Sequence, residues 1–333
     1  KLNLRNEKPI NRYNMKKTER LVSYYDLSIS AKSKTFECPK PISVREAFEL
    51  IKLIPLGKVL AKGNESLYMS YFEWTDDIIS ILINKSDKGI SDPIFTIPKE
   101  NKRRTAEKTE EEGQDFSSHI VIKLSNKDID PALVIIEQCH GLSVSTIKEL
   151  LNNIINDAKE ISPDKFKQMH PDGSVDNDGN PQKYDVIFKS EFDGHISNEL
   201  KDDLNHGKIR SIELITDKDQ NTDFDEEGYV KEKCKTLVLT LKDNENNIAN
   251  KYALIVKLFK KEKNNYSHAR IKLKTQSGLD RTVNMDTADG LVQHYVKKEK
   301  LDNFNYNLKS SYDKPDKSIL DKMKNLLLRE HND

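Results

Sequence analysis

Cysteine is scarce in this sequence, and its pattern excludes most roles that depend on sulfur. Cys38, Cys139 and Cys234 are far apart, odd in number and without a CxxC pair. A disulfide framework or a zinc ribbon needs cysteines at close, regular spacing, so we expect reduced thiols. Cys139 precedes His140, but adjacent residues of a strand point to opposite faces. A thiol nucleophile with that histidine as its base is therefore disfavoured.

Long apolar runs are also missing. No run approaches the roughly 18 residues needed to span a bilayer, and residues 1–20 contain no apolar stretch of the signal-peptide kind. We therefore expect a cytoplasmic protein without a membrane span. Hydrophobic residues still make up 35% of the 333 residues, and charged residues 33%, so the chain has enough apolar side chains to fold.

Complete catalytic and phosphate-binding motifs are absent as well. The sequence contains neither GxxxxGK[ST] nor GxGxxG, and its 8 histidines form no HExxH motif and no close pair of ligand spacing. Nucleotide hydrolysis and zinc catalysis thus have no support in the sequence, and we expect no cofactor. This favours a non-enzymatic role without deciding the question.

Two fragments point toward metal chemistry, and each has a simpler explanation. The alternation Ser174-x-Asp176-x-Asp178-Gly179, ending at Asp185, is similar to an EF-hand loop but begins with Ser and lacks the final Glu. An Asp- and Gly-rich turn explains it better. A second set is similar to the acid and lysine groups of metal-dependent nucleases but lacks a fixed spacing: Glu191, Asp193, Glu213 and Lys257. A solvated charged face accounts for that set.

The formal net charge is zero, yet the charges are distributed in blocks. Residues 1–20 carry seven Lys or Arg against two Glu, residues 157–227 nineteen acids against nine bases, and residues 251–274 eight bases against one acid. Such blocks can form separate surface patches of opposite potential. A positive patch suits a polyanion, and the acidic stretch 217–227 suits a basic protein partner.

The pattern of the first half predicts both strands and helices. β-Branched and aromatic residues favour strands at 24–31, 67–75, 77–84, 119–124 and 133–139. Ser43 with Glu46 forms a capping box that predicts a helix over 44–54, and Ser143 precedes an amphipathic helix that runs through Ile155. Residues 99–114 have almost no apolar side chain, so we expect an exposed charged loop there.

The second half predicts mainly sheet. Strands are expected at 184–192, 209–216, 236–242, 252–260, 268–275 and 281–285, followed by a helix over 317–329. We therefore predict an α+β protein of two units, each a largely antiparallel sheet with packed helices. The predicted bounds are an N-terminal domain 1–160, a linker or long turn 161–183, and a C-terminal sheet domain 184–333 that ends in the helix.

Basic residues are the strongest candidates for a binding site. In the run ARIKLKT, apolar residues alternate with Arg270, Lys272 and Lys274, so three cations share one strand face. If 252–260 is the neighbouring strand, its terminal lysines join them, and 99–114 adds a basic finger. The predicted nucleic-acid-binding residues are Lys102, Arg103, Arg104, Lys260, Lys261, Lys263, Arg270, Lys272, Lys274, Lys297 and Lys298. Three rings nearby could stack on bases: Tyr252, Tyr266 and His268.

An alternative explanation of the same residues is structural. Charged side chains on an edge hairpin protect a sheet from pairing with another chain. The sequence does not separate this role from phosphate binding.

The order of elements in the second half resembles a known group of proteins. The segments ARIKLKTQSGLDRT and DGLVQHYVKKEK, with the terminal helix, are similar to the phage-exclusion protein RexA and to related proteins of bacterial antiphage islands, including the KwaB subunit of Kiwa. The likeness covers about a quarter of the chain. It implies a DNA-binding sensor or effector that acts against phage, as a homo-oligomer and with a partner protein of the same system.

Three functional hypotheses follow. The leading one is a nucleic-acid-binding protein, DNA-binding in particular, of a bacterial antiphage defence or phage-exclusion system. The second is a metal-dependent nuclease effector with a cryptic acidic site. The third is a protein–protein adaptor that does not bind nucleic acid and that meets a basic partner through residues 217–227.

Overall fold

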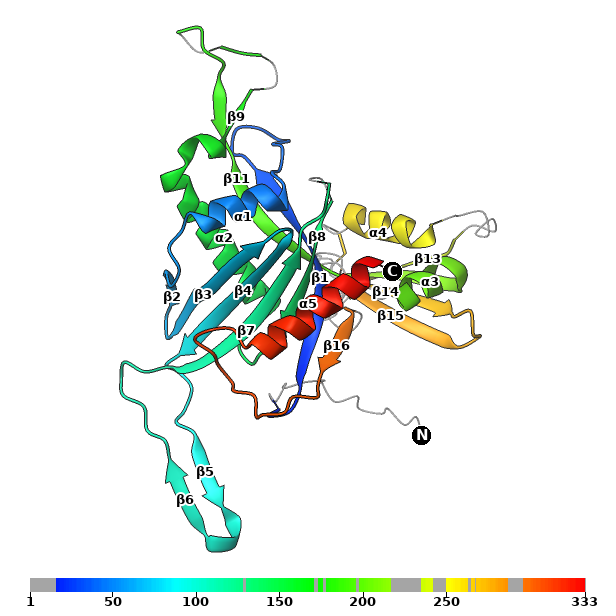
Figure 1. Cartoon of the computed structure of the whole chain (residues 1–333). Helices are drawn as coiled ribbons and strands as arrows, with labels where there is room; N and C mark the ends of the chain where they lie inside the picture. Colours follow the sequence, from blue (N-terminus) through cyan, green and yellow to red (C-terminus); the bar gives the residue numbers. More distant parts are fainter. Residues whose placement is uncertain are drawn as a thin grey trace, which may run out of the picture. The chain divides into compact units, whose positions relative to one another are not determined.

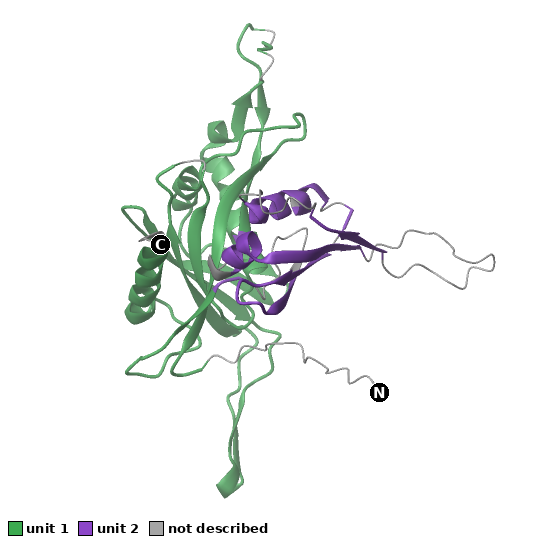
Figure 2. Cartoon of the chain, turned by 90° about the vertical axis from the view of Figure 1, so that its right-hand side faces the viewer, with its two compact units in different colours: residues 1–192, 298–333 green, residues 193–297 purple. Residues whose placement is uncertain are grey.

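The computed structural model describes residues 16–127, 130–170, 173–175, 178–195, 198–216, 235–241, 250–262, 265–266, 268–286 and 296–332. The chain forms two compact units (Figure 2). Unit 1 contains Lys1–Phe192 and Lys298–Asp333, and unit 2 contains Asp193–Lys297. Both units combine antiparallel sheet with packed helices, which confirms the predicted α+β class. Among the described residues, no helix is both long and apolar enough to cross a bilayer.

Unit 1 is built on one large sheet (Figure 1). Its strands follow the order β11-β1-β8-β7-β4-β3-β2, and β16 also pairs with β1. Their bounds are β1 Arg20–Lys32, β2 Val59–Lys62, β3 Glu65–Thr75, β4 Ile78–Asp87, β7 Gln114–Lys123, β8 Ala132–Glu137, β11 Ile187–Gly194 and β16 Lys298–Leu301. The central strands β4, β7 and β8 are almost entirely buried, because helices cover both faces of the sheet. Most of their buried side chains are apolar, but polar residues such as Asn84, His119 and Glu137 are buried there too.

Two helices cover one face of this sheet. Helix α1 (Val44–Lys52) begins at the predicted capping box, in which Ser43 and Glu46 satisfy each other's backbone N–H groups. Helix α2 (Val144–Ile161) begins at Ser143, whose side chain accepts the Thr146 N–H. The ring of Phe48 stacks on Phe72 of β3 at 6.4 Å between centroids. The apolar stripes of both helices thus fill this side of the core.

The C-terminal helix α5 (Lys317–Asn332) covers the opposite face. Its apolar stripe packs with side chains of β1, β7 and β8 in one cluster, which includes Ile319, Met323 and Leu327 of the helix and Val22, Tyr24, Val121 and Ile135 of the strands. Strand β16 precedes α5 and pairs with β1, with Arg20 opposite Leu301. The end of the chain therefore completes unit 1.

This assignment differs from the predicted domain bounds. The sequence placed residues 184–333 in one C-terminal domain, whereas contacts place β11 up to Phe192 and Lys298–Asp333 in unit 1. Unit 2 is thus an insertion between β11 and β16 along the chain. Helical periodicity marks the apolar stripe of α5, but it cannot say which sheet that stripe will cover.

Two hairpins replace segments for which the sequence predicted no regular structure. Part of the expected loop 99–114 is strand β6 (Lys102–Thr105), which pairs with β5 (Ile94–Ile97), and a 3-10 turn, η1 (Pro98–Glu100), joins them. The expected linker 161–183 contains a 3-10 turn, η2 (Pro163–Phe166), and β9 (Lys167–Met169), which pairs with β10 (Lys183–Asp185). Val175 forms a bridge with Pro181 within the second hairpin. The described part of the EF-hand-like stretch is therefore hairpin.

Unit 2 is a four-stranded antiparallel sheet with two helices on one face. The strand order is β13-β12-β14-β15. The bounds are α3 Asn198–His206, β12 Lys208–Thr216, β13 Lys235–Leu239, α4 Lys251–Glu262, β14 His268–Lys274 and β15 Asp280–Asp286. Leu204 of α3 and Ile255 and Phe259 of α4 share a core with Ile271 and Leu273 of β14. The helices therefore lie on the face to which the apolar residues of β14 point.

The strand predicted at 252–260 was wrong, because this run is helix α4. A short, nearly continuous apolar run does not distinguish strand from buried helix. Asn250 supplies the signal that was overlooked: its side chain accepts the Ala253 N–H at 2.8 Å, as an N-cap residue does. Ile255 and Phe259, four residues apart, then lie on one buried helical face.

A buried charge network ties the C-terminal segment of unit 1 to the sheet. Arg20 Nε lies 2.7 Å from Glu137 Oε1, and both side chains are at most 2% exposed. Arg20 Nη2 also donates to Lys309 O at 2.5 Å. The Asp316 N–H donates to His119 Nε2 at 2.9 Å, so the ring proton is on Nδ1, 2.5 Å from Glu137 Oε2. Glu137 thus forms an ion pair with Arg20 and accepts a hydrogen bond from the His119 ring.

Replacing Glu137 with Gln should destabilise unit 1 strongly. The amide cannot balance the buried Arg20 charge, and breaking a buried pair costs about 3–5 kcal/mol. We expect a loss of that size in the free energy of unfolding, measured by urea denaturation. The matched control is Glu149→Gln, which removes an exposed pair with Lys62 and should cost less than about 1 kcal/mol. Equal losses for the two variants would contradict the role assigned to Glu137.

Candidate nucleic-acid interface

The face of the unit 2 sheet opposite its helices carries the predicted row of cations. In β14, Ala269, Ile271 and Leu273 are buried in the core. Alternate residues point the other way, and the side chains of Arg270 and Lys272 are 43% and 48% exposed. Lys274 is also exposed. The predicted alternation is confirmed, and we call this side of the sheet the outer face.

Strand β12 adds two cations that the sequence analysis did not select. Lys208 lies directly opposite Lys274 in the antiparallel register, and Arg210 occupies the irregularity between Ile209 and Ser211. Directly opposed like charges destabilise a sheet, and Lys208 and Lys274 have no ion-pair partner within the described residues. Strand alternation in KIRSIELIT could have suggested Lys208, but only the register brings it to Lys274.

Acidic residues neutralise part of the outer face. Glu213 of β12 lies opposite Arg270, with 3.3 Å to Arg270 Nη1 and 2.5 Å to Lys272 Nζ. The hydrogen bond from Lys272 lowers the pKa of the Glu213 carboxyl, and the charge of Arg270 adds to this effect. Arg210 pairs with Asp280 of β15 at 2.8 Å. The pair of Lys208 and Lys274 is therefore the part of this face where positive charge is least compensated.

The remaining residues predicted for this surface lie elsewhere. Lys260 and Lys261 belong to helix α4, on the helical layer of unit 2, and Lys261 is exposed there. Lys263 lies outside the described residues. The Lys297 N–H donates to His195 O at 2.9 Å, and Lys298 begins β16 in unit 1, opposite Ser23.

The rings proposed for base stacking are likewise dispersed. Tyr252 lies on α4 and packs, with Tyr266, against the core of unit 2. His268 lies opposite Ile215 of β12 and is exposed. Among the described residues of the outer face, His268 is thus the ring placed with the cation row.

β14 is an inner strand, between β12 and β15. Strand β15 is the sheet edge, so β14 and β15 together form an edge hairpin. The cation row thus lies on an edge hairpin, and its explanation as protection of a sheet edge stays open beside phosphate binding.

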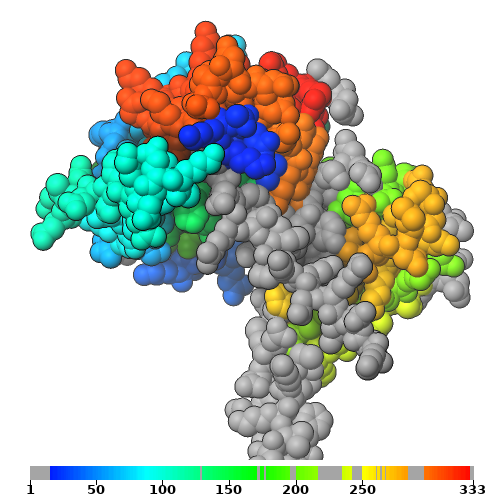
Figure 3. Space-filling view, turned by 90° about the horizontal axis from the view of Figure 1, so that it is seen from below, coloured from blue at the N-terminus to red at the C-terminus, as the bar shows by residue number. Residues whose placement is uncertain are grey.

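A second basic surface lies on the hairpin β5–β6 of unit 1, which we call the arm. Every residue of both strands is exposed, and the hairpin projects from the sheet (Figure 1). Figure 3, seen from below, shows the turquoise arm in full view. In the antiparallel register, Phe95 pairs with Arg104 and Ile97 with Lys102. The Arg104 guanidinium lies 4.9 Å from the centre of the Phe95 ring, so cations and apolar side chains share one face of the arm.

The acidic run after the arm does not pair with its cations. Glu111 pairs with Lys88 at 3.3 Å, and Glu112 accepts the Thr109 N–H at 2.9 Å. Within the arm, Lys102 pairs with Glu100 at 2.7 Å. Among the described residues, Glu111 and Glu112 are thus engaged away from Arg103 and Arg104.

The acidic candidates for metal binding have other partners. Glu191 pairs with Lys148 and accepts from Ser30, Glu213 lies between two cations, and Asp185 lies 3.6 Å from Lys159. Within the described residues, no three His, Cys, Asp or Glu side chains form a group that could hold a metal ion. Asp176 and the acidic stretch 217–227 lie outside the described residues.

Comparison of the chain with protein-family models, with curated proteins and with solved structures finds no match.

The two described thiols should differ strongly in reactivity. Burial raises the pKa of Cys139 to about 12, and the charge of Glu137 adds to the rise, whereas Cys38 is exposed. The thiolate is the reactive form, so at pH 7 iodoacetamide should alkylate Cys38 at least about 100-fold faster than Cys139. Peptide mass mapping over time measures both rates. Comparable rates in the folded protein would contradict the assigned environment of Cys139.

Proposed function

We propose that this protein binds nucleic acid, DNA in particular, as a component of a bacterial antiphage defence or phage-exclusion system. The observation that supports the binding most directly is the outer face of unit 2. Five cations from two adjacent strands gather there: Lys208, Arg210, Arg270, Lys272 and Lys274.

The arrangement suits the phosphate backbone. Alternate residues of a strand repeat about every 6.8 Å and adjacent strands lie about 4.8 Å apart, so the cations form a two-dimensional array. Such an array neutralises several phosphates and releases their counterions, without reading bases. Lys208 and Lys274 are directly opposed, and a bound phosphate relieves their repulsion.

The arm favours duplex DNA over duplex RNA. The major groove of B-form DNA admits a two-stranded β-ribbon, whereas the major groove of A-form RNA is too narrow for side chains to read. The arm is such a ribbon, fully exposed and carrying Lys102, Arg103 and Arg104 on one strand.

The assignment to phage defence rests on the resemblance to RexA and to related proteins such as KwaB, in the order of elements of the second half and in the segments 269–282 and 289–300. The partner protein and the homo-oligomer rest on it too and stay predictions. The adaptor hypothesis depends on residues 217–227, which lie outside the described residues.

Removing charge from the outer face should weaken DNA binding and its dependence on salt. For the double variant Lys272→Gln/Lys274→Gln, we expect the slope of log affinity against log salt to fall by about 1.8 on duplex DNA, because each phosphate contact contributes about 0.9. Fluorescence anisotropy with labelled duplex DNA from low to near-physiological salt measures this slope. Glu213→Gln should raise affinity, because it removes one negative charge from the outer face beside Arg270 and Lys272.

The matched control is Lys201→Gln/Lys261→Gln, which removes the same charge from the helical layer of unit 2. If it reduces affinity and slope as much as the outer-face variant does, total charge rather than this face governs binding. With Mg²⁺ present, a gel of the same mixtures reports cleavage, and degraded DNA would favour the nuclease hypothesis instead.

The arm should discriminate between nucleic-acid forms. Arg103→Gln/Arg104→Gln is expected to lower affinity for duplex DNA about tenfold and to leave affinity for single-stranded DNA nearly unchanged, because only the duplex offers a groove to a ribbon. Thr96→Ala/Thr105→Ala changes the same hairpin without changing charge and is expected to bind normally. An equal loss on both forms would argue against groove insertion.

A further inference from the structure

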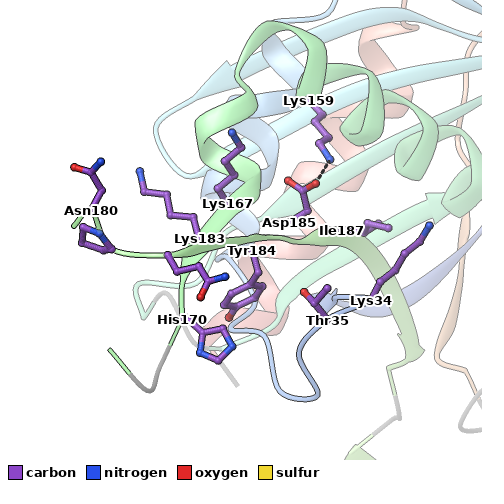
Figure 4. Close-up of a pocket in the computed structure, with 12 residues that line it drawn as sticks. Lys34, Thr35, Lys159, Lys167, His170, Asn180, Lys183, Tyr184, Asp185 and Ile187 are labelled. Atoms are coloured by element: carbon purple, nitrogen blue, oxygen red, sulfur yellow. Dashed lines mark ion pairs between the residues drawn. The ribbon is translucent and has the colours of Figure 1, made fainter. Parts of the chain in front are cut away.

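Unit 1 contains a basic pocket that is separate from the arm. Its volume is ≈ 870 Å³, and its lining includes Lys34, Lys159, Lys167 and Lys183. Lys34 comes from the segment after β1, whereas the other three lysines lie within residues 159–183, at the end of α2 and on the two strands of the β9–β10 hairpin (Figure 4). No charge run in the sequence marks them, because the fold alone brings them together.

Specific contacts fix the walls of this pocket. Gln168 of β9 accepts the Lys40 N–H at 3.0 Å and donates to Lys40 O at 2.6 Å, and Tyr184 Oη donates to the same side chain at 2.9 Å. The ring of Phe36 lies 5.1 Å from Tyr184 and 5.7 Å from His170, between centroids. The segment after β1 is thereby held against the hairpin, and the lysines are presented from a defined framework.

Positive charges outnumber negative charges in the lining of the pocket. Among the described residues of the lining, Asp185 is the single acid, and it pairs with Lys159 at 3.6 Å. Lys34, Lys167 and Lys183 have no ion-pair partner within the described part of the chain. Lys167 lies opposite Asp185 in the hairpin register, and Lys183 lies two residues from Asp185 on the same strand. Lys167 and Lys183 are therefore diagonal neighbours on one face, with Cα atoms about 7–8 Å apart.

We propose that this pocket binds a small oligophosphate, a ligand with two or more linked phosphate groups. The ammonium groups of Lys167 and Lys183, on diagonal positions, can each bind a different phosphate group. Lys159 and Lys34 supply further positive charge at the walls. Asn180, Gln182 and Thr35 add hydrogen-bonding side chains to the lining. Lysine is a strong phosphate ligand as a point charge, and the volume is within the range of small-molecule sites, about 300–1,000 Å³.

Charge density distinguishes this ligand from a simple carboxylate. A single carboxylate satisfies one or two lysines and leaves the others facing one another, whereas linked phosphates concentrate several negative charges over a few ångströms. The proposal does not depend on DNA binding, because the pocket lies wholly in unit 1 and the cation array that supports DNA binding lies in unit 2.

Isothermal titration calorimetry of the full chain with sodium tripolyphosphate, ATP and inorganic phosphate tests the proposal. We expect tripolyphosphate and ATP to bind with a stoichiometry of one, and inorganic phosphate to bind at least about tenfold more weakly. Lys167→Gln/Lys183→Gln should weaken binding of tripolyphosphate at least about tenfold. Asp185→Asn should strengthen it, because this change removes a negative charge from the lining.

The matched control is Lys52→Gln/Lys314→Gln, which removes the same charge from two exposed lysines of unit 1 outside the pocket lining and should bind like the parent protein. Three results would overturn the proposal: no binding of tripolyphosphate by the parent chain, the same loss in pocket and control variants, or ATP binding without tripolyphosphate binding. Circular dichroism of each variant identifies any that fail to fold, and Asp185→Asn then provides the remaining test, because a gain in affinity requires a folded pocket.

Discussion

Glu137 is fully buried and partners two groups that could not be buried without it: it forms an ion pair with the guanidinium of Arg20 and accepts a hydrogen bond from the ring of His119. Those groups in turn bond to Lys309 O and to the Asp316 N–H of the C-terminal segment. A buried charge is tolerated only when it is paired and hydrogen-bonded. Arg20 and His119 obtain their remaining hydrogen-bond partners only when the segment that follows β16 lies across β7 and β8. The core under α5 therefore depends on bringing the end of the chain back to β1.

This closure explains the architecture of the whole chain. Because β16 and α5 complete unit 1, everything between Asp193 and Lys297 is an insertion with its own core of α3, α4 and four strands. An insertion with a separate core can carry its own surface chemistry without disturbing the parent sheet. The cation array of unit 2 is an example, since the buried face of β14 serves the core and the alternate residues of the same strand remain exposed.

The candidate site was only partly predictable. Alternation in ARIKLKT placed Arg270, Lys272 and Lys274 on one face correctly, because period two is a property of any strand. Glu213 and Lys208 join that face only through the register of β12 with β14, and a register depends on which strands pair. The same limit hid the pocket lysines, because only folding brings Lys34, which follows β1, to the lysines of residues 159–183.

The sequence by itself determined the local features: the capping box of Ser43 and Glu46, the cap of α2, most strands, and the α+β class. These depend on neighbouring residues, whose geometry is the same in any fold. Tertiary structure decided whether 252–260 became strand or helix, which sheet α5 covered, and which charges became neighbours. A short apolar run is compatible with both the helical and the strand periodicity, and the apolar stripe of an amphipathic helix can pack on any apolar face. The partner of a charged side chain depends on chain segments that meet only after folding.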